Sequence, residues 1–168
     1  NINTNLGVKE KFVDNLVGNV NLIREKKGVK SFALYTSIDC WNERAEYIRT
    51  GLKLDLWERN FHTYAMGTKT PVNFMITFNA LTVSTFKTLL VKILEWRKQY
   101  EGIIVPDSDS KRTIRFDTPY LKEPLHYDMN ILPKDEFMPY MKESLDFIEQ
   151  NIDDSDPTMF QTVEFEKF

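Results

Sequence analysis

The chain has 168 residues, and its 22 Lys and Arg against 25 Asp and Glu give a formal net charge of −3 at pH 7. Hydrophobic residues make up 42% and aromatic residues 13%, so a domain of this length can bury about 70% of its unfolded surface. This composition excludes intrinsic disorder for most of the chain. The mildly acidic balance carries no electrostatic signal for a nucleic-acid partner.

Neither a membrane span nor a secretory signal is predicted. No apolar run approaches the ~18 residues of a span, and residues 1–5 lack the basic flank and apolar stretch of a signal peptide. Cys40 is the single cysteine, which excludes an internal disulfide and, by itself, a zinc or iron–sulfur site. We therefore expect a cytoplasmic protein without a membrane partner, in which Cys40 is a small buried hydrophobic residue.

Strand-like and helical segments alternate along the chain. In order, the pattern predicts a strand near 1–5, a helix over 8–26, a strand at 31–38, a helix over 53–66, a strand at 72–78, a helix over 83–100, a strand at 113–116 and a helix after Asp135. Parallel strands need long connections, whereas antiparallel strands can be joined by tight hairpins, for which there is no signal. The alternation therefore predicts an α/β fold with parallel strands.

The segment 152–168 is harder to assign to the domain predicted for 1–151. Apolar residues alternate along it at Phe160, Val163, Phe165 and Phe168. This is too apolar for a solvated tail, so we expect the segment to pack on another surface, as a tail or as the start of a truncated C-terminal extension. A first residue other than Met likewise predicts a trimmed fragment.

Each predicted strand has one apolar and one polar face, because side chains alternate along a strand. Leu34 opposes Tyr35 and Ser37, and Phe74 opposes Thr77. A closed, fully packed barrel would place bulky aliphatic residues inside, so a polar inner face predicts a wet or ligand-filled cavity. The alternative is an antiparallel sheet with one solvated face, which has the same alternation.

Polar residues gather late in these strands. They are Ser37 and Asp39, Thr77 and Asn79, and Asp117. Ligands of parallel α/β folds bind at the carboxyl ends of the strands. Because helical crossovers bring successive strand ends to the same edge, we expect these residues to converge on one cavity there.

Four short motifs occur in order along the chain, at 4–7 (TNLG), 37–39 (SID), 46–51 (EYIRTG) and 76–79 (ITFN). Together they resemble successive strand ends of radical S-adenosylmethionine (radical SAM) enzymes, and more narrowly the phage and bacterial twitch-domain type. The resemblance extends over residues 1–151. It implies an open parallel (β/α) partial barrel, with this chain holding roughly the third to sixth strands of a six-stranded barrel.

The resemblance also implies residues that bind S-adenosylmethionine. They are Thr4, Asn5, Gly7, Ser37, Asp39, Arg49, Thr77 and Asn79. In this reading Ser37 and Asp39 contact the ribose or the amino-acid portion of the cofactor, and Arg49 holds its carboxylate. The residues alone leave simpler roles open: a salt-bridged surface arginine for Arg49, a helix cap for Asp39 and a strand-ending turn for Asn79.

One family feature is absent. The C-x-x-x-C-x-x-C loop that binds the 4Fe-4S cluster does not occur, and the resemblance places it before Asn1, in a missing N-terminal barrel half. Such a cluster needs three or four thiolates, so we expect it only in a full-length parent, which would cleave S-adenosylmethionine reductively and abstract hydrogen from an unknown substrate. This chain alone is expected to be inactive. The alternative function is a noncatalytic α/β module that binds a small ligand or a protein.

Overall fold

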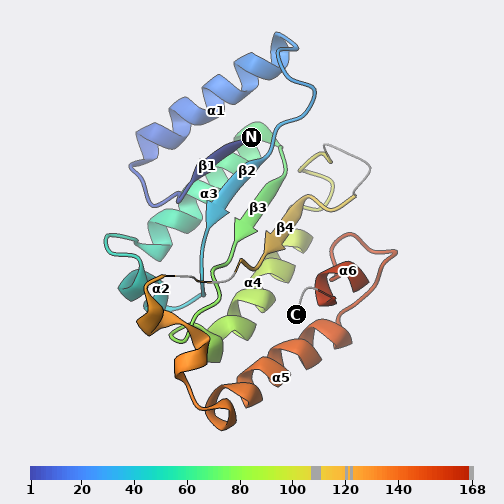
Figure 1. Cartoon of the computed structure of the whole chain (residues 1–168). Helices are drawn as coiled ribbons and strands as arrows, with labels where there is room; N and C mark the ends of the chain where they lie inside the picture. The colour runs from blue at the N-terminus through green and yellow to red at the C-terminus, as the bar shows by residue number, and fades with distance from the viewer. Residues whose placement is uncertain (107–110, 120, 122, 167–168) are drawn as a thin grey trace.

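A computed structural model of the chain describes residues 1–106, 111–119, 121 and 123–166. In this part of the chain, four strands form one sheet in which all neighbours are parallel (Figure 1). They are β1 (Ile2–Thr4), β2 (Leu34–Ser37), β3 (Val72–Met75) and β4 (Ile114–Asp117), in the spatial order of the sequence. The prediction of adjacent parallel strands at 31–38, 72–78 and 113–116 is confirmed, and the antiparallel alternative is wrong.

Long helices connect the strands and cover one face of the sheet. α1 (Glu10–Glu25), α3 (Leu54–Thr68) and α4 (Phe86–Gln99) follow β1, β2 and β3. Because successive strands are neighbours and such crossovers are right-handed, the three helices lie on the same side, behind the sheet in Figure 1. The opposite face carries no helix in the residues that the structure describes. We call this opposite side the open face.

The remaining helices are short or lie at the end of the chain. They are α2 (Glu43–Ile48), the 3₁₀ helices η1 (Val83–Thr85), η2 (Leu125–Tyr127) and η3 (Met129–Ile131), the long α5 (Lys134–Gln150) and α6 (Thr162–Phe165). The helix predicted over 83–100 is thus η1 followed by α4. The helix predicted over 53–66 continues to Thr68, so Gly67 lies inside it, and Lys69 in the left-handed region (φ 54°) ends it.

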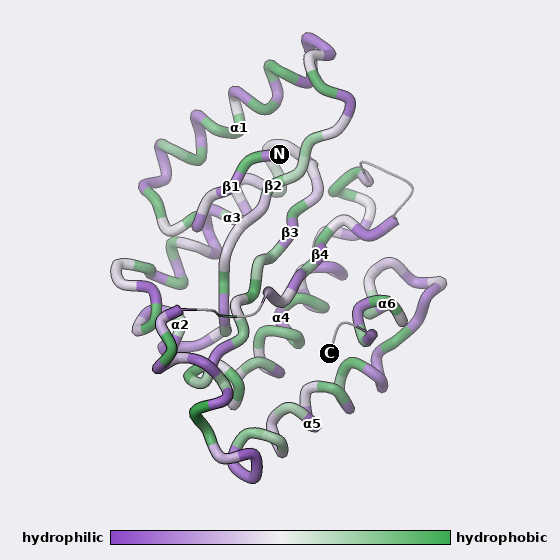
Figure 2. The backbone as a smooth tube through the Cα atoms, in the orientation of Figure 1, coloured by the Kyte–Doolittle hydropathy of each residue, from purple (hydrophilic) through white to green (hydrophobic). Residues whose placement is uncertain are grey.

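An aromatic cluster joins α3 and α4 to β3. The rings of Trp57 and Phe61 on α3 meet Phe74 of β3 and Trp96 of α4, with centroids 4.9 to 5.8 Å apart. All four side chains are fully buried. Apolar residues repeat along the helices between hydrophilic ones (Figure 2), as expected for helices that place one face on a core. This core holds the sheet from one side and leaves the open face free for other contacts.

The helices α1 and α3 approach each other closely at Gly67. A Cβ atom there would lie 2.6 Å from Cγ1 of Val17, a β-branched residue with little rotamer freedom. We expect Gly67→Ala to lower the free energy of unfolding by about 1 to 3 kcal/mol because of this overlap. Gly18→Ala on α1, with nothing within 4 Å, should instead raise it by about 0.5 to 1 kcal/mol. Urea unfolding of both variants measures these changes. Val17→Ala, combined with Gly67→Ala, should restore part of the lost stability, because it removes the overlapping methyl groups. Equal effects of the two glycine substitutions would contradict the close approach of the helices.

The C-terminal segment packs on the same chain. Phe160 is fully buried between Phe116 of β4 and Phe147 of α5, with ring centroids 6.1 and 6.0 Å away. Glu164 on α6 is also fully buried and pairs with Arg97 of α4 at 2.7 Å. The expectation that this apolar segment packs on a surface is confirmed for Phe160 and, in part, for Phe165, whereas Val163 is 48% exposed. Position 168 lies outside the described residues.

Candidate functional site

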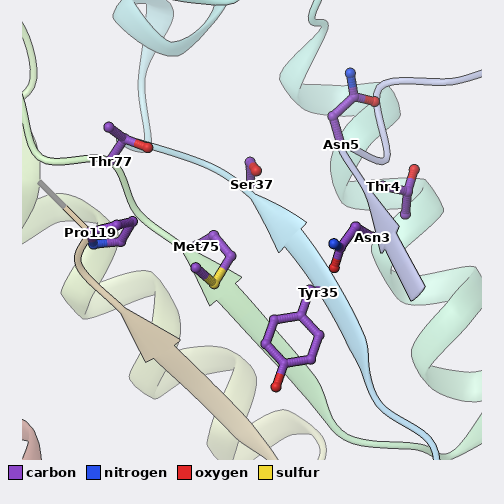
Figure 3. Close-up of a pocket in the computed structure, with 8 residues that line it drawn as sticks. All are labelled: Asn3, Thr4, Asn5, Tyr35, Ser37, Met75, Thr77 and Pro119. Carbon is purple, nitrogen blue, oxygen red and sulfur yellow. The ribbon is translucent and has the colours of Figure 1, made fainter. Parts of the chain in front are cut away.

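A cavity of about 520 Å³ opens at the carboxyl end of the open face (Figure 3). It is lined by Asn3, Thr4, Asn5, Tyr35, Ser37, Met75, Thr77 and Pro119. These residues come from the ends of β1, β2 and β3 and from the loop after β4. None of the lining residues carries a charge at neutral pH. The volume lies in the range of small-molecule sites, which is about 300 to 1,000 Å³.

The strand register explains why most of these side chains share one face; Thr4, which pairs with Thr36, is on the other face of β1. Asn3 of β1 lies opposite Tyr35 of β2, and two residues farther along β2 Ser37 lies opposite Met75 of β3. Residues two apart in a strand point to the same side. The intervening Thr36 points to the helices and is buried. The sheet therefore has one polar face, as the alternation predicts, and this face borders a cavity.

The predicted cofactor-binding residues divide into two groups. Thr4, Asn5, Ser37 and Thr77 line the cavity, whereas Gly7, Asp39, Arg49 and Asn79 do not. Within the described part of the chain, the hydroxyls of Ser37 and Thr77 make no hydrogen bond to protein, so both can serve a ligand. The expectation that Ser37, Asp39, Arg49 and Asn79 all reach one cavity is met by Ser37 alone.

Arg49 is engaged within the protein. Its Nε and Nη2 donate to the two carboxylate oxygens of Asp39 at 2.7 and 3.0 Å. Asp39 is buried, and a buried carboxylate needs a counter-charge. Arg49, which stands at the C-terminal end of the nearby α2, supplies that charge. Its guanidinium is taken up in this bidentate pair, and Arg49 does not line the cavity.

Asp39 also holds the end of β3. The backbone N–H of Thr77 donates to Oδ1 of Asp39 at 2.9 Å, a contact that joins the loop after β2 to the next strand. A single carboxylate therefore fixes Arg49 and Thr77 at once. Asp39 does not cap α2, which is capped by the side chain of Asn42. Its role is to position the Thr77 side of the cavity.

Asn79 and Gly7 shape the loops beside the cavity. The side-chain amide of Asn79 donates to Thr77 O at 2.9 Å, and its Oδ1 accepts from Leu81 N at 3.0 Å. This is the strand-ending turn that the sequence left open as an alternative. Gly7 donates its N–H to Oδ1 of Asn5 at 3.1 Å, and a Cβ atom on Gly7 would lie 3.0 Å from Leu52. Gly7 thus lets the loop after β1 pass close to the chain that precedes α3.

Cys40 follows Asp39 but does not fit a metal ligand. Its side chain is fully buried, and its Sγ donates to Oδ1 of Asn42 at 3.6 Å. Burial raises the pKa of the thiol to about 11, whereas metals bind the thiolate. Among the described residues, no group of three or more His, Cys, Asp or Glu could hold a metal ion. The residues present here therefore do not fit a 4Fe-4S cluster.

Several cavity residues were not among the predicted ones. Asn3, Tyr35, Met75 and Pro119 line it as well. The strand alternation could have found Tyr35, which shares a face with Ser37, and Met75, which shares a face with Thr77. Pro119 lies in an irregular segment after β4, where no periodicity applies.

Comparison with known proteins returns no relative. No family model, curated protein or solved structure matches the chain. No helix in the described residues is long and apolar enough to cross a membrane. Functional inference for this chain therefore depends on the geometry of the open face and its cavity.

Proposed function

We propose that this chain is the cofactor-binding part of a radical SAM enzyme and that its cavity binds the nucleoside portion of S-adenosylmethionine. One observation carries the proposal. Uncharged hydroxyl and amide side chains line a cavity at the carboxyl ends of consecutive parallel strands, on a sheet whose helices cover a single face. A strand order of 1-2-3-4 with one bare face is the order of an open (β/α) barrel.

The chemistry of the lining suits a ribonucleoside. Hydroxyl and amide groups of Ser37, Thr77 and Asn3 can donate to and accept from a ribose diol. Tyr35 and Met75 add apolar surface. With no charged group in the lining, the cavity offers no counter-ion to a phosphate or a carboxylate, so the charged amino-acid end of the cofactor would extend out of it.

The chain's part in the reaction is binding and orientation. In a full-length enzyme a 4Fe-4S cluster would supply the electron for reductive cleavage, and the described residues of this chain provide no group that could hold it. Asp39 holds Thr77 in place through its backbone N–H, and Ser37 stands on the neighbouring strand. A noncatalytic small-ligand module is the second candidate, because the cavity lining includes no carboxylate, histidine or lysine for acid–base chemistry.

Calorimetric titration with S-adenosylmethionine tests the proposal. We expect Ser37→Ala to weaken binding about 2-fold to 10-fold, because one neutral hydrogen bond is lost. Ser31→Ala is the matched control, since Ser31 is exposed at the amino end of the same strand region. An affinity of Ser37→Ala equal to that of the wild type would contradict the assignment. Tight binding of an unrelated nucleoside, with no heat from S-adenosylmethionine, would favour the noncatalytic module.

A further inference from the structure

Positive charge gathers at the amino end of the sheet, opposite the end that holds the candidate site. Two segments contribute it: 22–32, which runs from the end of α1 toward β2, and 68–71, which runs from the end of α3 to β3. Against the single acid Glu25 they carry five cations, Arg24, Lys26, Lys27, Lys30 and Lys69. We call these two segments the basic end. Its formal charge is +4, whereas the whole chain has −3, so the rest of the chain has −7. Such a separation of charge directs one end of a molecule toward an anionic partner.

A small cleft lies within the basic end. Arg24 and Lys30 line it, together with Ser31 and with Val105 from the segment before β4, and its volume is about 100 Å³. This is about three times the volume of a water molecule in the liquid, so the cleft admits a group the size of a phosphate. Its lining in the described part of the chain includes no acid. Nη1 of Arg24 donates to Thr68 O at 2.5 Å, which joins the two segments, and its other guanidinium donors remain for an anion.

Two of the lysines stand where glycine is the usual residue. Lys27 follows α1 with φ 52°, and Lys69 follows α3 with φ 54°. A residue in this left-handed conformation often ends a helix, and it is mostly glycine because other side chains are strained there. The helix dipole favours a cation at the same place, and this gain offsets the strain. Lysine therefore brings the fold no advantage over glycine at either position, and its charge is available to a partner.

Aliphatic side chains are exposed among these cations. Leu22, Ile23 and Val29 are 47%, 40% and 40% exposed, and Val105 of the cleft is 54% exposed. In Figure 2, hydrophobic and hydrophilic residues follow one another through the end of α1 and the loop beyond it. Single strands of nucleic acid are held by cations together with aromatic rings. Lysines mixed with apolar side chains are instead typical of surfaces that lie on a bilayer, where the apolar groups enter the headgroup region.

We propose that the basic end binds the surface of an anionic phospholipid bilayer, with a lipid phosphate at Arg24 and Lys30 and with Val29 among the headgroups. Each lysine or arginine near an anionic leaflet adds to the attraction, and no membrane span is needed. The sequence patterns predict no membrane partner because they concern spans and signals, whereas this contact depends on which cations share a surface. The inference is independent of the proposed function, because the cavity lies at the other end of the strands.

The test is co-sedimentation with vesicles of equal parts phosphatidylserine and phosphatidylcholine, and with vesicles of phosphatidylcholine alone. We expect the chain to bind the first and not the second. Lys27→Gly combined with Lys69→Gly should weaken binding about tenfold or more, since each cation contributes about fivefold. The melting temperature should stay close to that of the wild type, because glycine suits both backbone positions. Lys134→Gln combined with Lys142→Gln removes the same charge at exposed positions of α5 and should bind like the wild type.

Other outcomes decide against the bilayer. Equal binding to both kinds of vesicle, binding to neither, or equal losses from the two pairs of variants would overturn the proposal. If the glycine variant fails to fold, Lys27→Gln combined with Lys69→Gln removes the same charge and must show the same loss. Binding of a single-stranded oligonucleotide without vesicle binding would assign the basic end to a nucleic acid. Saturable shifts of the Arg24 and Lys30 signals in inorganic phosphate, again without vesicle binding, would assign the cleft to a free anion.

Discussion

Replacing Glu164 by glutamine is expected to lower the free energy of unfolding by about 3 to 5 kcal/mol. The carboxylate is fully buried and pairs with Arg97 at 2.7 Å and with Arg112 at 3.1 Å. Arg97 is also buried, with its side chain 1% exposed, so removal of the negative charge leaves its guanidinium uncompensated. Urea unfolding measures the change. Glu166→Gln, an exposed position two residues on, should stay within about 0.5 kcal/mol of the wild type.

The contacts of Arg97 explain why the effect should be global. Its Nε donates to Ile114 O of β4 at 2.9 Å, and its Nη1 donates to Met159 O at 2.8 Å. The pair therefore joins α4, the last strand and the C-terminal segment. A loss below about 1 kcal/mol for Glu164→Gln, in the range of an exposed ion pair, would show that this segment contributes little to the fold.

Replacing Asp39 by alanine is expected to cost about 3 kcal/mol of stability, because hydrogen bonds to a charged group are each worth about 1.5 to 3 kcal/mol. The variant leaves Arg49 and the backbone N–H of Thr77 without their acceptor. The variant should also weaken the binding of S-adenosylmethionine, because Thr77 lines the cavity. Asp39→Asn retains an oxygen for Thr77 and should preserve more of the binding than Asp39→Ala. Unfolding in urea and calorimetry measure the two effects.

A double-mutant cycle sharpens this expectation. If Arg49 acts through Asp39, Arg49→Ala added to Asp39→Ala should cost less than the sum of the single variants. Asp14→Ala, at an exposed position of α1, is the control and should change stability by no more than about 0.5 kcal/mol. Additive losses from Asp39→Ala and Arg49→Ala would contradict the pairing. A normal affinity in a folded Asp39→Ala variant would show that Thr77 does not need this support.

The arrangement of strands follows from local patterns. The alternation of strand-like runs with amphipathic helices predicts parallel neighbours, since each crossover must return the chain to the same edge. The period-two pattern in 31–38 and 72–78 also predicts the polar face on which Ser37 and Thr77 stand. These features depend on residues close in sequence, so the sequence alone contains them.

Pairings between distant side chains are not visible in such patterns. Arg97 and Glu164 are 67 positions apart, and no periodicity relates a helix residue to a buried carboxylate in a later segment. The pairing of Arg49 with Asp39 is also not visible in the sequence. A carboxylate and a guanidinium can each bind a ligand, and only the fold shows that these two bind each other. The short helices α2 and α6 escape prediction because four to six residues do not complete an apolar stripe.

The unpaired amide of Asn73 also depends on the three-dimensional structure. The sequence places Asn73 on a polar strand face, but its burial and the absence of a partner for Nδ2 among the described residues emerge when neighbouring strands are in place. Proteins tend to violate such local rules at functional sites.

The most direct test of the central claim, that the open face holds the ligand, is a ¹H–¹⁵N titration of the chain with S-adenosylmethionine. We expect the backbone amide signals of Asn5, Ser37 and Thr77 to shift in a saturable, concentration-dependent way. The signals of Ser31, at the opposite end of the sheet, and of Thr88, exposed on α4, should not move. Saturable shifts confined to the helix-covered side, or no shifts at all with the fold intact, would contradict the claim.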